Sequence, residues 1–257
     1  MKLVDKIKRI KKSKRKLVCL TAYSKPIAKV LDRYCDIVLV GDSVATAFYG
    51  MKSTREIKLD TMINHLISVK KALTKSILVF DMPFNTYKNI KEAKKNVREV
   101  FRKSRCDAVK FENNGKNFNI VKQIVESGMP VMGHIGYTPQ YKKAFKPQGL
   151  KEKEEKKLIL DAIKIEEAGA FAIVLECINF KTAKKITESI SIPTIGIGSS
   201  NVCDGQILVV DDLIGLSGFY PKFVKKYANL EKILNNALKK FRSDVIKGKF
   251  PKRSNTY

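Results

Sequence analysis

The chain has 257 residues, of which 44% are hydrophobic and 30% are charged, an ordinary balance for a soluble globular protein. No stretch approaches the roughly 18 uninterrupted apolar residues that a membrane-spanning helix needs, which argues against an integral membrane protein. The net charge of +26 suits an anionic partner such as a nucleic acid, an anionic membrane or an anionic small molecule.

The N-terminal segment 1–16, MKLVDKIKRIKKSKRK, predicts a basic helix. It has neither the apolar core nor the small-residue cleavage site of a secretory signal, so we expect a cytoplasmic protein. The five cysteines are odd in number and scattered, and none shows CxxC spacing. Neither a disulfide framework nor a zinc site is therefore expected.

After this helix, short apolar runs typical of strands alternate with longer segments of helical periodicity. In the first half of the chain, the predicted strand and helix pairs are 16–23 with 25–34, 36–42 with 60–73, 76–83 with 91–101, and 107–112 with 117–128. In the second half they are 130–136 with 153–169 and 170–176 with 180–190, followed by strands at 192–199 and 206–216 and two C-terminal helices.

Strands that alternate with helices in this way require a parallel sheet with right-handed crossovers. About eight such units in this length predict an α/β fold, a closed (β/α)8 TIM barrel. We expect one domain over residues 1–257, with the basic N-terminal helix and the C-terminal helices attached to the barrel. An open doubly wound sheet is the alternative, but the glycine-rich stretch GIGSS (196–200) lies late in the chain and is not GxGxxG.

Polar residues collect at the C-terminal ends of the predicted strands, which meet at one mouth in a barrel of this type. An Asp between a strand and a helix can simply cap the helix, and this remains the alternative for each residue taken singly. Together, however, several carboxylates at one mouth repel each other unless a cation holds them, and such oxygen donors suit Mg²⁺. Asp42 is then best explained as a metal ligand. The residues at these ends are Asp42, Ser43, Asp81, Lys110, Glu112, His134 and Glu176.

Eight motifs resemble those of the ketopantoate hydroxymethyltransferase family, and they occur in the same order as in that family. They are LTAY (20–23), LVGDS (39–43), DMPF (81–84), VKFE (109–112), GHIGYTPQ (133–140), LEC (175–177), IPTIGIG (192–198) and DGQILVVDD (204–212).

The resemblance implies a barrel of the phosphoenolpyruvate mutase/isocitrate lyase superfamily, usually assembled as a homo-decamer. It also implies an activity in pantothenate (coenzyme A) biosynthesis. The family transfers a hydroxymethyl group from 5,10-methylenetetrahydrofolate, its co-substrate, to 3-methyl-2-oxobutanoate, giving 2-dehydropantoate. The expected partners are thus a small keto acid and a folate, with Mg²⁺ as the cofactor.

By matching motif, the resemblance implies that Asp42 and Asp81 hold Mg²⁺ and that Glu112 completes the site directly or through water. Asp42, Ser43, Asp81 and Lys110 are then expected to contact the keto acid. Glu176 is the implied proton acceptor, and its position after an apolar strand is expected to raise its pKa toward a useful range.

His134 has two readings, an active-site hydrogen-bond donor to the substrate or a buried structural histidine. The chain also departs from the family pattern in ways that bear on folate contacts and loop geometry. The departures are Ser24, Ala45, Ser199, Ser200, Asp211 and a short lysine-rich loop at 141–149.

Two other functions remain open from the sequence. One is another Mg²⁺-dependent C–C lyase or mutase of the same superfamily acting on a 2-oxo acid, although no KKCGH-like loop with a catalytic cysteine is present. The other is a basic nucleic-acid-binding protein. The positive charge is spread as lysine pairs over most predicted helices without interleaved aromatic residues, so we expect a solvated surface and no specific nucleic-acid partner.

Overall fold

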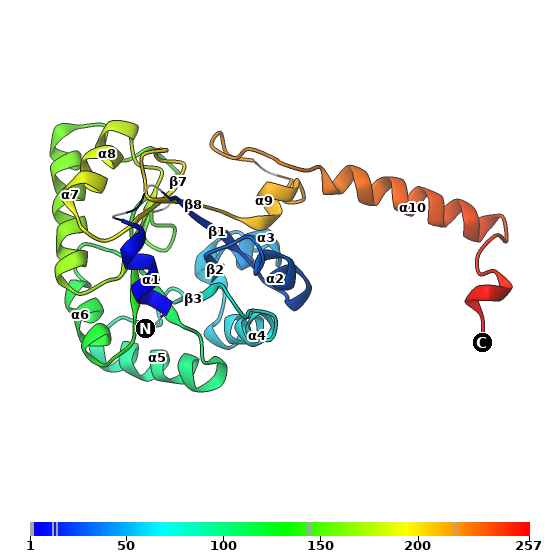
Figure 1. The fold of residues 1–257 in the computed structure, drawn as a ribbon, viewed down its shortest axis with the longest axis horizontal. Helices are drawn as coiled ribbons and strands as arrows, with labels where there is room; N and C mark the ends of the chain where they lie inside the picture. Colours follow the sequence, from blue (N-terminus) through cyan, green and yellow to red (C-terminus); the bar gives the residue numbers. More distant parts are fainter. Residues whose placement is uncertain (1–2, 12, 14, 143–144, 219) are drawn as a thin grey trace. The chain divides into compact units, whose positions relative to one another are not determined.

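In the computed structural model, residues 17–208 contain a closed barrel of eight parallel strands, ordered β1 to β8 as in the chain (Figure 1). The structure describes residues 3–11, 13, 15–142, 145–218 and 220–257. The predicted (β/α)8 barrel is confirmed. Its strands are β1 (Leu17–Thr21), β2 (Ile37–Val40), β3 (Ile77–Asp81), β4 (Ala108–Glu112), β5 (Val131–Gly136), β6 (Ala172–Glu176), β7 (Thr194–Ile197) and β8 (Gly205–Leu208).

Helices follow the strands and pack their apolar sides onto the barrel. In α5, Ala93, Val97 and Val100 are buried at helical spacing, and the Asn89 side chain caps the helix by accepting a hydrogen bond from the Glu92 N–H (2.9 Å). The helical segments around the barrel are α1 (Leu3–Ile10), α2 (Lys25–Leu31), α3 (Val44–Ala47), η1 (Thr54–Glu56), α4 (Leu59–Lys70), α5 (Ile90–Ser104), α6 (Phe118–Glu126), α7 (Glu152–Glu167) and α8 (Phe180–Ser189).

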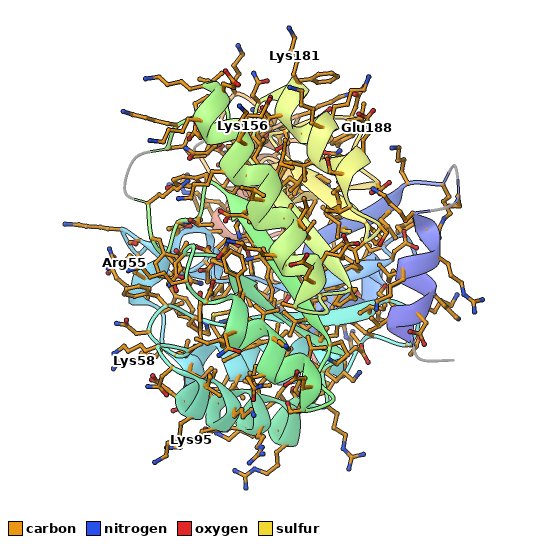
Figure 2. All side chains as sticks on the ribbon, turned by 90° about the vertical axis from the view of Figure 1, so that its left-hand side faces the viewer. Arg55, Lys58, Lys95, Lys156, Lys181 and Glu188 are labelled. Carbon is orange, nitrogen blue, oxygen red and sulfur yellow. The ribbon has the colours of Figure 1, made fainter. Side chains whose placement is uncertain are left out.

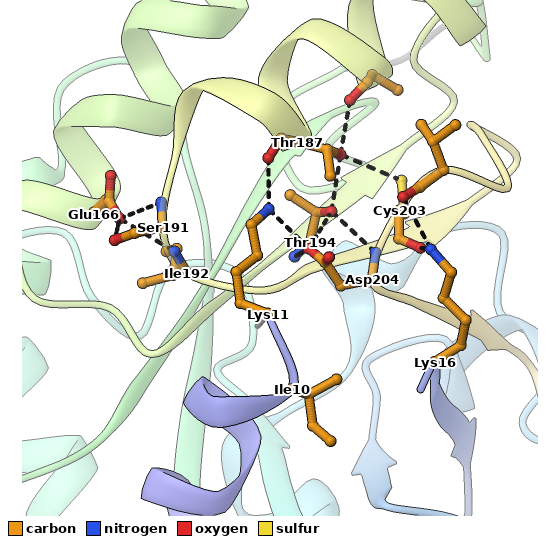
Figure 3. A network of polar contacts seen from close by, with 12 residues as sticks. Ile10, Lys11, Lys16, Glu166, Thr187, Ser191, Ile192, Thr194, Cys203 and Asp204 are labelled. Carbon is orange, nitrogen blue, oxygen red and sulfur yellow. Dashed lines mark hydrogen bonds and ion pairs between the residues drawn. The ribbon is translucent and has the colours of Figure 1, made fainter. Parts of the chain in front are cut away.

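The basic N-terminal helix α1 packs into the barrel core. Val4 and Ile7 are buried in one cluster with residues of the barrel strands. Lys11 directly follows the helix in the chain, and its Nζ donates hydrogen bonds to the Thr187 carbonyl and to Asp204 Oδ2 (3.0 Å), as Figure 3 shows. Asp204 directly precedes β8, and Thr187 lies near the end of α8, the helix that leads into β7. These contacts therefore fix α1 near the N-terminal ends of the strands. The C-terminal ends, where barrel enzymes carry out their chemistry, stay open.

The predicted last strand is shorter than expected. β8 ends at Leu208, and the apolar run 206–216 continues as the short helix α9 (Val210–Ile214). Asp211 and Asp212 lie in the first turn of α9, where the positive end of the helix dipole favours carboxylates. The prediction of a strand over this whole run was therefore wrong, and one of the family departures, Asp211, lies on a helix.

Contacts within the chain define two compact units, Met1–Val209 and Val210–Tyr257. The first holds the whole barrel, and the second holds α9, α10 (Leu230–Ile246) and the 3-10 helix η2 (Arg253–Asn255). The single domain expected over residues 1–257 stays a prediction. Within the described ranges, none of the helices combines the length and the hydrophobicity needed to cross a membrane.

Candidate active site

The C-terminal ends of β2 to β6 bring the predicted site residues together. Asp81 at the end of β3 pairs in register with Lys110 on β4. In the same way Glu112 on β4 pairs with His134 on β5, and Gly136 at the end of β5 pairs with Glu176 on β6. Paired residues on neighbouring parallel strands point to the same side of the sheet, so the barrel directs these side chains to one place.

Lys110 and Asp81 form a buried ion pair. Lys110 Nζ donates to both carboxylate oxygens of Asp81 at 2.8 Å, and the two side chains are only 5% and 3% exposed. Burial acts to lower the pKa of Lys110, but the charges of Asp81 and Glu112 outweigh it and leave the pKa above its ordinary value. Lys110 therefore carries a fixed positive charge inside the mouth.

Asp42 lies beside this pair in the loop after β2. Its Oδ2 accepts a hydrogen bond from Gln140 Nε2 (2.9 Å), and its backbone N–H points to Asp81 Oδ2 at 3.5 Å. Burial, followed by the negative charge of Asp81, raises the pKa of Asp42 to about 7. The negative charge of Asp81 beside Asp42 favours a cation at this place.

Gln140 is a site residue that the sequence reasoning missed. Its side chain is fully buried, and its Nε2 donates to Asp42 and to the Met82 carbonyl (3.0 Å). Its backbone N–H donates to Glu112 Oε2 (2.9 Å), and its Oε1 accepts from the Tyr87 hydroxyl. One residue in the loop after β5 thus fixes two of the expected metal ligands. The only feature of the sequence that pointed to Gln140 as a site residue was its place at the end of the GHIGYTPQ motif.

His134 lies between two carboxyl groups. Its Nε2 is 3.3 Å from Glu176 Oε2, and its Nδ1 is 3.8 Å from Glu112 Oε1. Neither ring nitrogen has a hydrogen-bond partner within the described part of the chain. Burial, with help from the nearby Lys110 charge, lowers the pKa of His134 well below its usual range, so the imidazole is neutral. Both nitrogens remain available to a substrate.

Glu176 ends β6 beside His134. Burial raises its pKa to about 7, and the more distant positive charge of Lys110 opposes this shift only in part. Its backbone is held by Tyr137, whose N–H donates to the Glu176 carbonyl (2.8 Å). Gly136, with φ of +100°, makes this approach possible, because a Cβ there would come within 2.1 Å of that carbonyl oxygen.

Ser43 follows Asp42 and begins the short helix α3. Its Oγ lies 2.8 Å from the Tyr23 hydroxyl, which orients the serine at the edge of the mouth. Ser199, one of the departures from the family pattern, accepts from the Ile178 N–H (3.0 Å) and donates to the Leu175 carbonyl (2.7 Å), so it holds the loop after β6. Of the altered loop at 141–149, residues 143–144 lie outside the described residues.

The carboxylate oxygens of Asp42 and Asp81 are the type of ligand atom that Mg²⁺ prefers. No group of three or more His, Cys, Asp or Glu side chains in the described ranges is arranged to hold a metal ion. The pair Asp42 and Asp81 nevertheless provides the one or two carboxylates that Mg²⁺ takes from a protein, since waters and substrate oxygens usually fill the rest of its shell. Three buried carboxyl groups, those of Asp42, Asp81 and Glu112, and the partly exposed Glu176 lie near the ammonium of Lys110, so a further cation fits the local charge.

Solved structures with the same fold support the barrel assignment. A phosphonopyruvate hydrolase matches with a TM-score of 0.62 and 12% identity, over 99% of this chain and 93% of the other. A phosphoenolpyruvate phosphomutase from Streptomyces platensis subsp. rosaceus matches with a TM-score of 0.63 and 11% identity, over 95% and 88%. A 2,3-dimethylmalate lyase described as a PEP mutase/isocitrate lyase superfamily member matches with 0.59 and 12%, over 96% and 89%. At these identities the likeness concerns the fold.

Sequence relatives are much closer. The 3-methyl-2-oxobutanoate hydroxymethyltransferase of Pelagibacter ubique is 50% identical over 248 residues, which is 96% of this chain and 96% of that protein. The enzyme of the same name from Thermotoga maritima is 44% identical over 260 residues, covering 99% and 96%. The family model described as ketopantoate hydroxymethyltransferase matches residues 2–253. The resemblance carried by the motifs is thus confirmed, and the chain belongs to the ketopantoate hydroxymethyltransferase family of enzymes.

Proposed function

We propose that this chain transfers a hydroxymethyl group from 5,10-methylenetetrahydrofolate to 3-methyl-2-oxobutanoate, giving 2-dehydropantoate for pantothenate biosynthesis. Family membership over nearly the whole chain supports the reaction. The observation that carries the mechanism is Glu176, a carboxyl group that is 17% exposed and lies beside a neutral histidine, with a pKa raised to about 7. A base with a pKa near the working pH is best suited to remove a proton from carbon.

In this proposal Glu176 removes the proton from C3 of the keto acid, and the electron pair moves to the keto oxygen to form an enolate. Lys110 supplies a fixed positive charge that stabilises this oxyanion without needing to reorganise. His134, as a neutral imidazole without a hydrogen-bond partner among the described residues, can donate its single N–H to the substrate. Ser43 and Asp81 are the remaining proposed contacts to the keto acid.

We assign Asp42 and Asp81 as the residues that would hold Mg²⁺, with Glu112 directly or through water. Bound there, Mg²⁺ would act as a Lewis acid toward the keto oxygen. Gln140 contributes by holding the carboxyl groups of Asp42 and Glu112 in place before any substrate arrives.

The methylene carbon of the folate is bonded to two nitrogens, and one of these C–N bonds first opens to give the iminium form. The enolate carbon then bonds to the methylene carbon, and the second C–N bond breaks as the nitrogens take up protons. Water supplies the hydroxyl group, so that keto acid, methylenetetrahydrofolate and water become 2-dehydropantoate and tetrahydrofolate. Holding both reactants in one mouth removes the cost of a bimolecular encounter.

We further propose that the enzyme acts in the cytoplasm as a homo-oligomer, a decamer by the family resemblance. One side of the helix α10 is apolar, which suits packing against another surface such as that of a neighbouring subunit. Its exposed large apolar side chains are Ile233, Leu234, Leu238, Phe241, Val245 and Ile246. A basic surface does not need a nucleic-acid partner, since it also speeds the encounter with anionic substrates.

The decisive assay measures 2-dehydropantoate formed from 3-methyl-2-oxobutanoate, with and without methylenetetrahydrofolate and with and without Mg²⁺. We expect product only when both are present. Folate-independent cleavage of a 2-oxo-dicarboxylate would support the lyase or mutase alternative instead.

A further inference from the structure

A cavity of about 310 Å³ lies beside the active site, between the loops that follow β3, β4 and β5. It shares a wall with the catalytic centre through Tyr87. The Tyr87 ring lines the cavity, and its hydroxyl donates to Gln140, which in turn holds the carboxylate of Asp42. Two side chains, Tyr87 and Gln140, therefore connect a ligand in this cavity to the proposed metal ligand Asp42.

The cavity is suited to an anion. Lys88 and Lys116 line it and both are exposed, and the ammonium group of neither makes a hydrogen bond or an ion pair within the described residues. None of the residues that line it is acidic. The ammonium groups are thus free to pair with carboxylates of a ligand.

The start of helix α6 adds to this positive character. Its N-cap residue Asn117 lines the cavity but does not cap the helix with its side chain. Instead its Nδ2 donates to the Glu112 carbonyl (2.8 Å) and its Oδ1 accepts from the Asn114 N–H (3.3 Å). The first backbone N–H groups of α6 lack a side-chain partner at this end, and such a helix start favours negative charge.

The cavity also presents aromatic surface. The rings of Phe84 and Tyr141 line it and meet edge to face, with centroids 6.0 Å apart and an interplanar angle of 74°. The guanidinium carbon of Arg55, which does not itself line the cavity, lies 4.2 Å from the Phe84 ring centroid. An aromatic ring of a ligand can pack here while its acidic groups reach the cations.

A second cavity of about 260 Å³ on the other side of Tyr141 lacks this character. Acidic as well as basic residues line it, among them Glu154, Lys157 and Asp161. Its Lys142 is already engaged, since its Nζ donates to the Gly136 carbonyl (2.7 Å) and to Gln148. The cavity with Lys88 and Lys116 is the better site for an acidic ligand.

We infer that this cavity binds the benzoyl-glutamate end of the folate co-substrate, an inference that rests on the proposed function. The benzoyl ring packs against Phe84 and Tyr141, and the glutamate carboxylates pair with Lys88 and Lys116. Polyglutamate tails place more carboxylates near these cations, so they gain more than the monoglutamate form.

The test compares two double variants. One carries both Lys88→Gln and Lys116→Gln, and the matched control carries both Lys91→Gln and Lys95→Gln. The control removes the same charge from exposed positions on α5 that do not line the cavity; Lys95 is labelled in Figure 2. The KM for methylenetetrahydrofolate is measured with mono- and triglutamate forms, alongside kcat and the KM for the keto acid. As a check on the barrel site, exchange of the C3 proton of the keto acid with D₂O is followed without folate.

We expect the cavity variant to raise the folate KM roughly threefold to tenfold, as for the loss of two exposed ion pairs, and to raise it more for the triglutamate. Its kcat and the keto-acid KM should stay near those of the wild type, and the control should leave every value unchanged. Equal folate KM values for the two double variants would overturn the cavity assignment alone. A wild-type enzyme that exchanges the C3 proton but makes no 2-dehydropantoate with folate would instead overturn the proposed function.

Discussion

Gln140 Nε2 donates a hydrogen bond to Asp42 Oδ2 at 2.9 Å, although the two residues lie 98 positions apart in the chain. The same amide is fixed from its other side by the Tyr87 hydroxyl, which donates to Oε1. An Asp oxygen that is held in this way keeps its orientation before a metal or substrate binds, which is how outer residues tune a metal site. The loop after β5 therefore positions an acidic group that comes from the loop after β2.

Gln140→Leu tests this relationship, because it keeps a similar volume but removes the donor to Asp42. The hydrogen bond from Gln140 acts to lower the pKa of Asp42. Without it the pKa of Asp42 rises, so a proton competes more strongly with the metal for this carboxylate. We expect Mn²⁺ affinity, measured by titration calorimetry, to fall roughly 10- to 100-fold. Gln123→Leu on α6 is the control, and Tyr87→Phe should have a smaller effect in the same direction. Unchanged affinity in Gln140→Leu would remove Gln140 from the set of positioning residues.

Asp42→Asn and Asp81→Asn test the metal ligands. Each keeps the size of the side chain but removes a negative charge, so Mg²⁺ or Mn²⁺ affinity and turnover should each fall by at least about 100-fold. Asp60→Asn on α4 is a suitable control, because the Asp60 side chain is 82% exposed. Full activity of either site variant at low Mg²⁺ would contradict the assignment.

Glu176→Gln isolates the proton acceptor. Without folate, the wild type with Mg²⁺ should exchange the C3 proton of 3-methyl-2-oxobutanoate with D₂O, and the variant should do so roughly 10²- to 10⁴-fold more slowly. NMR loss of the C3 proton signal measures the rate, and the exposed Glu167→Gln on α7 is the control. Keto-acid affinity should change little, because Glu176 is not a proposed ligand.

The pH profile of the same exchange provides an independent check. Since Glu176 has a pKa near 7, the wild-type rate should rise with pH through that value and level off above it. If the variant exchanges normally yet makes no 2-dehydropantoate, Glu176 instead handles protons on the folate nitrogen, and His134 becomes the candidate base.

The raised pKa of Glu176 also predicts a stability effect. A Glu in the unfolded chain titrates near 4.3, so between about pH 4 and pH 7 the folded state keeps a proton that the unfolded state releases. The free energy of unfolding of the metal-free enzyme should therefore fall as pH rises through this window. Glu176→Gln cannot ionise, so its melting temperature should exceed that of the wild type by roughly 5 °C at about pH 8 and by little at about pH 4. A larger gain at the acidic end would contradict the sign of the shift.

The basic surface predicts weak and unspecific nucleic-acid binding. If the charge of +26 is only a solvated surface, any binding to DNA or RNA should fall steeply with salt and show no sequence preference. Fluorescence anisotropy with several unrelated oligonucleotides at increasing NaCl measures this. A sequence-specific complex that persists at about 0.2 M salt would favour the nucleic-acid alternative.

The sequence by itself determined the barrel and the edge at which the site lies. The alternation of apolar runs and helical segments is a local pattern, readable within about ten residues at a time, and a parallel sheet follows from it. The strand ends with Asp81, Glu112 and Glu176 were predicted for the same reason, since a polar residue that ends a buried strand marks the mouth of a barrel. The last strand was extended furthest beyond its observed end, because the apolar run 206–216 continues into α9.

Only the tertiary structure decided how the site is held and what lies next to it. Gln140 meets Asp42 across 98 residues and Tyr87 across 53, and such contacts depend on how the barrel closes and on how loops cross its rim. The cavity beside Lys88 and Lys116 likewise needs three loops from three strands at once. Loop positions are set by long-range packing and carry no periodic signal, whereas strands and helices repeat their pattern along the chain.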